Sequence, residues 1–144
     1  MSATVTPRDV LDFWFAAGKE KWFVKDETFD RECAVRFQAA HEAARDGACD
    51  DWRDSAQGCL ALIILLDQFP RNIYRDSPEA FAADPKALAL AKDVVARGID
   101  VEVPADARKW LYLPFEHSEE MIDQERGVEL FERLGDEETA KWAR

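Results

Sequence analysis

The sequence of 144 residues is poor in the features that define several common classes of protein. It has three cysteines, and none of them forms a CxxC pair, so neither a disulfide framework nor a zinc knuckle is indicated. The N-terminus has no apolar core and does not look like a secretory signal. The longest apolar run, Cys59 to Leu66, is far shorter than the roughly 20 residues that span a bilayer. We therefore expect a cytoplasmic protein.

Positive charge is also scarce. The chain has 19 Lys and Arg against 30 Asp and Glu, which gives a formal net charge of -11 at pH 7. Such a chain repels nucleic-acid phosphates and anionic membrane surfaces, so we expect neither as a partner. No glycine-rich phosphate-binding motif is present, which excludes the common nucleotide-binding folds. A hydrophobic content of 47% with 34% charged residues is typical of a globular domain, and the length predicts one domain over residues 1–144.

Apolar residues recur with a helical period over most of the sequence. Capping residues and prolines predict that helices start near Thr6, Asp26, Ser55, Asp84 and Pro104. Glycines predict that helices end near Gly18, Gly47 and Gly98. The segment 101–103 alternates like a strand but is too short to build a sheet. The sequence therefore predicts an all-α fold of antiparallel helix pairs joined by short loops.

The central helix, expected over about 55–69, is apolar on all sides and should be the hub of the core. Pro70 has no backbone donor, so we expect the helix to end just before it. Asp67 falls on an apolar stripe of this helix, and a carboxylate there needs a partner, for which Arg71 and Arg75 are the nearest candidates. These polar residues form either a buried latch that closes the helix end or the floor of a binding site.

A second polar group is expected at the start of the last long helix, which we predict to begin near Pro114. The spacing predicts that the inward stripe of this helix consists of Phe131, Val128, Gln124, Met121 and His117. Glu120 lies three residues from His117, on an adjoining edge. The unpaired N–H groups of a helix start would favour an anion there. The alternative is that His117 is a satisfied core histidine and that the neighbouring acids merely suit the first turn.

Other chemistry is only weakly indicated. His117 and Glu120 have a spacing that lets both reach one metal ion, but a second such pair is lacking, so we predict neither a metal nor another cofactor. Ser118 adjoins His117, and adjacent residues on a helix point away from each other, so no serine–histidine pair is implied. His41 has no acid or cysteine spaced to join it and is interpreted as a filler between helices.

Several segments carry a family resemblance, namely DFWF at 12–15, KWF at 21–23 with ETFD at 27–30, LALIILLDQFPRNIYR at 60–75, AFAADPKAL at 80–88 and LPFEHSEE at 113–120. Over about residues 8–135 the sequence resembles an uncharacterised, mainly bacterial family known as domain of unknown function 924. The resemblance implies a tetratricopeptide-like, right-handed α-superhelix and no established reaction. Members usually continue into a FGRFPHRN-like element that this sequence lacks, so the resemblance implies a partial site if that element completes the pocket.

The leading hypothesis for function is a binding module for a small anionic molecule or peptide. Its site would lie where the end of the central helix meets the start of the last one. The ligand-binding residues are predicted to be Gln68, Arg71, Asn72, Arg75, Glu116 and Gln124. The two arginines would hold a carboxylate or phosphate, while Trp14, Trp22 and Phe69 would wall an apolar part.

Two other functions remain open. The first is a hydrolase, with or without a metal ion, in which His117 acts as general base and Asp67 or Glu120 orients it. The second is a scaffold that binds partner helices along a concave surface, which predicts an apolar groove and no deep polar pocket. A distance between the Asp67 carboxylate and the His117 ring of about one hydrogen bond would indicate a shared site, whereas a long distance would make the two groups separate structural devices.

Overall fold

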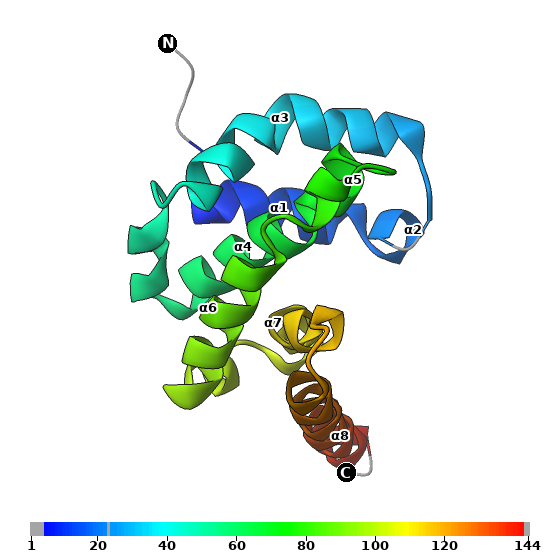
Figure 1. Cartoon of the computed structure of the whole chain (residues 1–144). Helices are drawn as coiled ribbons and strands as arrows, with labels where there is room; N and C mark the ends of the chain where they lie inside the picture. Colours follow the sequence, from blue (N-terminus) through cyan, green and yellow to red (C-terminus); the bar gives the residue numbers. More distant parts are fainter. Residues whose placement is uncertain (1–4, 23, 143–144) are drawn as a thin grey trace.

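The computed structural model of the protein describes residues 5–22 and 24–142, without the side chains of residue 19 and residues 136–142. Every regular element in these ranges is helical (Figure 1), which confirms the predicted all-α class. The elements are α1 (Pro7–Ala17), α2 (Lys19–Trp22), α3 (Glu27–Arg45), η1 (Asp50–Asp54), α4 (Ala56–Asp67), α5 (Phe69–Ile73), η2 (Pro78–Phe81), α6 (Asp84–Ala96), η3 (Ile99–Glu102), α7 (Ala105–His117) and α8 (Met121–Trp142). The tetratricopeptide-like superhelix stays a prediction from the resemblance.

The helix starts follow the local capping signals. Thr6 forms a capping box with Asp9, and the side chains of Asp26 and Ser55 accept hydrogen bonds from the first turns of α3 and α4. These caps satisfy backbone donors that have no partner within the helix. The predicted starts of α1, α3 and α4 are therefore confirmed.

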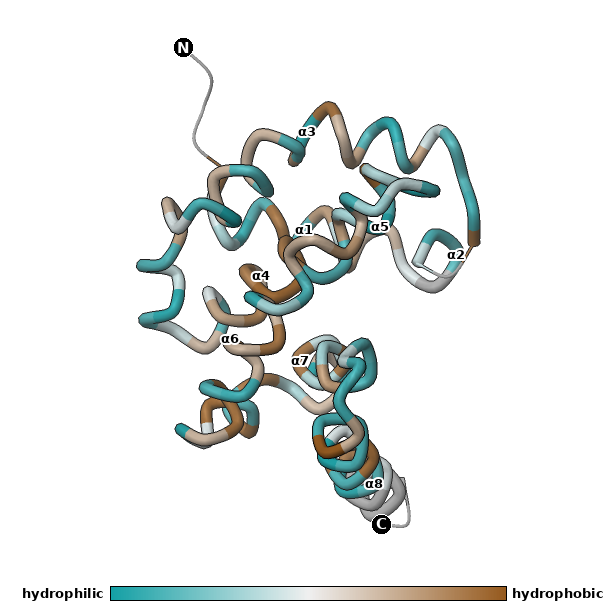
Figure 2. The backbone as a smooth tube through the Cα atoms, in the orientation of Figure 1, coloured by the Kyte–Doolittle hydropathy of each residue, from teal (hydrophilic) through white to brown (hydrophobic). Residues whose placement is uncertain are grey.

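The core is built around α4, which is buried along nearly its whole length and is packed by α1, α3, α6 and α7. Figure 2 shows this helix as a hydrophobic segment at the centre of the molecule. Beside it, an aromatic cluster joins α1, α3 and α5, in which the rings of Phe37 and Phe69 stack at 4.8 Å and Trp14 lies 5.4 Å from Phe69. Burying each of these side chains contributes about 1.5–3 kcal/mol. The predicted role of the central helix as hub is confirmed.

The end of the central helix differs from the prediction. The helix α4 ends at Asp67, and after Gln68 a new short helix, α5, begins at Phe69 with Pro70 in its first turn. A proline is tolerated there because the first turn has no use for its missing N–H. The polar residues of LLDQFPRN therefore lie at a one-residue break between two helices.

The predicted start of the last helix near Pro114 is wrong. The helix α7 continues through Pro114 to His117, and α8 begins at Met121. The prediction treated proline as a boundary, but packing of α7 against α4, α6 and α8 keeps the helix continuous despite the lost backbone hydrogen bond. His117 therefore sits at a helix C-terminus, where exposed carbonyl groups favour cations, so the argument for an anion at a helix start does not hold.

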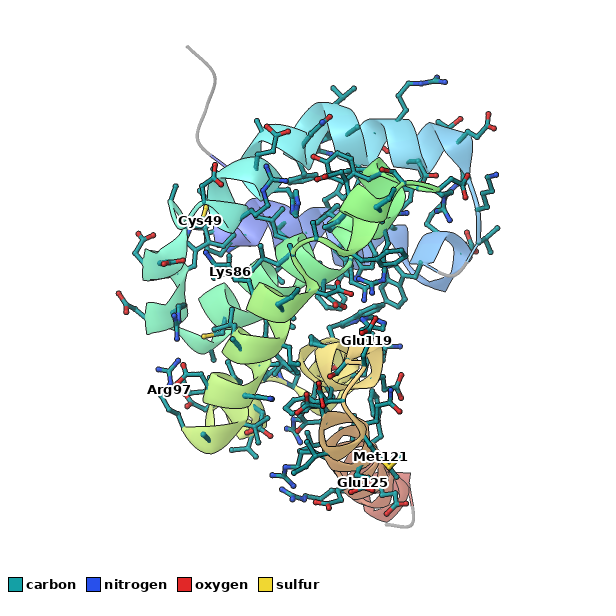
Figure 3. The ribbon with its side chains drawn as sticks, in the orientation of Figure 1. Cys49, Lys86, Arg97, Glu119, Met121 and Glu125 are labelled. Atoms are coloured by element: carbon teal, nitrogen blue, oxygen red, sulfur yellow. The ribbon has the colours of Figure 1, made fainter. Side chains whose placement is uncertain are left out.

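The inward stripe of α8 is also different from the prediction. Met121 is 73% exposed and Val128 54% exposed, while the buried positions are Asp123, Gly127, Leu130 and Leu134. The prediction was counted back from Phe131 and Val128, but the inner face runs through Leu130 and Leu134, and residues 118–120 are not helical, so the register does not continue to His117. In Figure 3, Met121 and Glu125 lie on the outer part of α8, away from α4.

Candidate functional site

The two predicted polar groups meet in the folded protein. His117 at the end of α7 hydrogen-bonds through Nδ1 to Oδ1 of Asp67 at the end of α4, at 2.9 Å. Asp67 is 0% exposed, and the His117 side chain is 24% exposed. A carboxylate only accepts, so Nδ1 carries a proton, and in the neutral form of the ring Nε2 keeps a lone pair. Asp67 therefore orients His117, as the sequence hypothesis of a shared site requires.

The buried carboxylate of Asp67 has further partners at the helix break. The side-chain amide of Gln68 donates to Oδ2 at 2.7 Å, and Arg71 Nη1 lies 3.5 Å from Oδ1. Arg71 Nη1 also donates to the main-chain carbonyl of Asp67. A carboxylate without water is stable only with such partners. The latch that the sequence suggested at this helix end is present.

Both arginines of the predicted site are already paired with carboxylates. Arg71 makes a bidentate pair with Asp84, with both N–O distances at 2.9 Å. Arg75 makes a second bidentate pair with Asp30 at 2.7 and 3.0 Å, and Asn72 donates to the same carboxylate at 2.9 Å. Burial raises the pKa of Asp30, but the hydrogen bonds from Arg75 and Asn72 outweigh burial and hold it below its usual value. These pairs fix the arginines in place.

A recess of about 310 Å³ opens beside these groups. It is lined by Trp22, Val24, Lys25, Gln68, Arg71, Asn72, Arg75, Leu113 and His117. The lining holds three cationic side chains and no acidic one, although the whole chain carries -11. The aspartates that pair with Arg71 and Arg75 do not line the recess. The side chains that face the recess are therefore cationic, although two of the three cations are paired with aspartates behind them.

Lys25 and Leu113 were not predicted as site residues. Lys25 lies on the connector between α2 and α3, far in sequence from the LLDQFPRN segment. In the part of the chain that the structure describes, Lys25 forms no ion pair or side-chain hydrogen bond. Its only signal in the sequence is its nearness to Trp22, which lines the same recess. Tertiary packing places it there, so local pattern could not identify it.

A second recess, of about 480 Å³, adjoins His117. It is lined by Phe81, Asp84, Pro85, Leu88, Pro114, His117, Ser118, Glu119, Glu120 and Asp123. This lining holds four acids and no lysine or arginine. Figure 3 shows Glu119 just beyond the end of α7. His117 lines both recesses, and the Arg71–Asp84 pair spans them because Arg71 lines the first and Asp84 the second.

The structure separates the other predicted site residues. Glu120 lines the second recess and forms no hydrogen bond with His117, whose Nδ1 is held by Asp67. Glu116 and Gln124 line neither recess, and Gln124 donates to the Ser118 carbonyl at 2.7 Å. Of the proposed aromatic walls, Trp22 lines the first recess, whereas Trp14 and Phe69 are fully buried core residues.

Among the described residues, no three His, Cys, Asp or Glu side chains lie together as a group able to hold a metal ion. Within the same ranges, no helix is both long and apolar enough to cross a membrane. His41 is 1% exposed and donates from Nδ1 to the Leu65 carbonyl at 2.9 Å, as a residue packed between helices does.

Known proteins resemble this chain in sequence and in fold. Residues 10–143 match the model of a family described as bacterial protein of unknown function, domain of unknown function 924. A solved structure of a protein of unknown function from Agrobacterium tumefaciens is 43% identical, with a TM-score of 0.86 over 89% of this chain and 73% of that chain. No curated protein matches the sequence. The resemblance inferred from the motifs is confirmed.

Proposed function

We propose that this chain, which belongs to that bacterial family, binds a small molecule through a carboxylate or phosphate group in the recess beside His117. The observation that carries the proposal is the lining of this recess, which has three cations and no acid in a chain of net charge -11. A concave site with a few convergent polar groups is the usual form of a small-molecule site. The cytoplasmic location predicted from the sequence is consistent with this role.

The anion would be held by donors that the protein's own aspartates leave unused. Arg75 Nη1 and Arg71 Nε form no hydrogen bond within the described residues, and Lys25 has no ion pair there. Charge-assisted hydrogen bonds of this kind are about twice as strong as neutral ones. Trp22 and Leu113 offer apolar walls for the rest of the ligand. Binding thus relies on Lys25 and on the spare guanidinium donors.

The test is titration calorimetry with inorganic phosphate and a panel of simple carboxylates. We expect Lys25→Gln to weaken binding by about tenfold, because it removes one charge-assisted contact without breaking an ion pair among the described residues. Arg31→Gln is the matched control, since it removes one positive charge from the exposed face of α3, outside the recess. The proposal fails if no anion binds, or if the two variants behave alike.

A second candidate, a hydrolase, is favoured by one specific observation, the hydrogen bond between Asp67 and His117. This bond leaves Nε2 of His117 as an acceptor, and no described residue hydrogen-bonds to that atom, so it is suited to take a proton from a water molecule. Ser118 is not placed as a nucleophile, since its hydroxyl donates to Asp123 at 2.8 Å.

The hydrolase is tested by a panel of ester and phosphoester substrates. It requires that His117→Gln lose turnover while phosphate or carboxylate binding persists. Equal turnover in the two proteins, or none with any substrate, removes this candidate. The scaffold hypothesis predicted no deep polar pocket and is not supported by the two recesses described above.

A further inference from the structure

The two recesses that meet at His117 are lined by side chains of opposite charge. The first is lined by Lys25, Arg71 and Arg75, and the second by acids. We propose that the natural ligand is dipolar, with a carboxylate or phosphate in the first recess and an ammonium group in the second, as in an amino acid or a short peptide. This inference rests on the proposed anion site and adds the class of ligand.

The second recess has negative charge that the protein does not neutralise. Asp84 is paired with Arg71, and Asp123 with Lys92 at 2.8 Å. In contrast, the side chains of Glu119 and Glu120 are exposed and form no ion pair or hydrogen bond within the described part of the chain. No lysine or arginine lines this recess. An incoming ammonium group would meet two unpaired carboxylates there.

The walls of the second recess suit an organic cation. Phe81 is 57% exposed although its ring is large, and it lines the recess with Pro85, Leu88 and Pro114. The Phe81 ring already holds the Arg71 guanidinium 5.2 Å from its centroid, so it serves here with the other apolar walls to accommodate the carbon atoms that carry an ammonium group. Because the described residues hold no three-ligand metal group, the recess is better matched to an ammonium than to a metal ion.

The two recesses adjoin each other at two features. His117 lines both, and the Arg71–Asp84 pair contributes one residue to each. A ligand that reached from one recess to the other would pass His117 and could donate a hydrogen bond to its Nε2, which has no partner among the described residues. A ligand with only an anionic group would leave the second recess unused.

The experiment compares three linear probes, aminohexanoate, hexanoate and hexylamine, by titration calorimetry on the full chain. Shorter and longer amino acids, aminobutyrate and aminooctanoate, allow for the span between the recesses. We expect the best amino acid to bind about tenfold more tightly than the carboxylate of equal length. The double variant Glu119→Gln with Glu120→Gln should remove this advantage and leave hexanoate binding unchanged.

The control is the double variant Glu125→Gln with Glu132→Gln, which removes the same charge from exposed positions of α8 outside both recesses. It should retain the preference for the amino acid. If hexanoate binds and no amino acid binds more tightly, the dipolar ligand is wrong and the anion site stands. If neither hexanoate nor phosphate binds, the proposed function falls as well. Hexylamine binding as tightly as aminohexanoate would also overturn the inference.

Discussion

The α4–α5 junction and the α7–α8 corner both surround His117, and they hold their charged groups in opposite ways. At the junction, the carboxylate of Asp67 is fully buried and Arg71 is engaged by two aspartates. At the corner, Glu119 and Glu120 are exposed and unpaired within the described residues. Removing the Asp67 carboxylate leaves three partners without their acceptor, whereas removing a corner acid leaves no partner unsatisfied within the described residues. The junction is therefore needed for stability as well as lining the proposed anion site, and the corner acids can change without such a cost.

The largest effect is expected at the junction. Asp67→Ala removes the acceptor of His117, Gln68 and Arg71 at once, so we expect it to lower the free energy of unfolding by about 3–5 kcal/mol. Urea unfolding followed by circular dichroism measures this. Glu120→Ala at the corner should change stability by less than about 0.5 kcal/mol. Equal losses in the two variants would erase the proposed difference between the regions.

A smaller effect is expected where α8 rests on α7. A Cβ added at Gly127 would lie 3.0 Å from the Phe115 Cβ, so in Gly127→Ala the facing part of α7 must move by a few tenths of an ångström. We expect this strain to exceed the helix-propensity gain of about 1 kcal/mol, so that the variant is destabilised. Gly135, in the same helix, has nothing within 4 Å of an added Cβ. Gly135→Ala should therefore stabilise the protein by up to about 1 kcal/mol. Thermal unfolding of both variants tests whether the corner is positioned by this close contact.

Acid is expected to lower the stability of the protein through His41. Burial lowers the pKa of His41, so the folded protein binds its proton less readily than the unfolded chain does. Its contribution to stability is present above the ordinary histidine pKa of about 6.5 and is lost as pH falls below that value toward the lower folded pKa. Urea unfolding between about pH 7.5 and about pH 5.5 should show this loss.

The matched variant is His41→Asn, which keeps a donor for the Leu65 carbonyl and cannot titrate. Its stability should depend less on pH across the same range, whatever its absolute value. An identical slope in both proteins would mean that His41 is not the source of acid sensitivity.

The smallest effect is expected on the outer face of α8. Ile122 is 75% exposed, so Ile122→Gln should change the free energy of unfolding by less than about 0.5 kcal/mol. Leu130, on the inner face of the same helix, is 1% exposed, and Leu130→Gln should cost several times more. A large, concentration-dependent loss in Ile122→Gln would indicate that this face is covered by another molecule.

Local signals account for what the sequence predicted well. Thr6, Asp26 and Ser55 cap helices through hydrogen bonds to the residue three positions on, so they are visible in a short window. The apolar stripe likewise identified Asp67 as a buried acid that needs partners. These features depend on spacing along one helix and not on the arrangement of helices.

The failures share a different cause. Pro114 lies inside α7 because neighbouring helices hold it there, and no local pattern reports that packing. The inward stripe was counted from Val128, which is exposed, and so was carried to Met121 and Gln124, whereas packing buries Leu130 and Leu134. Lys25 and Phe81 come to the recesses from a connector and from the short helix η2, outside the LLDQFPRN and LPFEHSEE segments. The sequence could raise the question of whether Asp67 and His117 meet, but the answer depends on the packing of α4 against α7.

The burial of the C-terminal end of α4 has an electrostatic consequence. Aligned peptide dipoles place about half an elementary negative charge at the C-terminal end of a helix, and here that pole lies in the interior instead of in water. The Arg71 guanidinium supplies a counter-charge at the Asp67 carbonyl, and His41 donates a hydrogen bond to the Leu65 carbonyl. Substituting the residues that end this helix would therefore destabilise the fold. In the proposed site, ligand preference can change at lower cost through Lys25, Glu119 and Glu120.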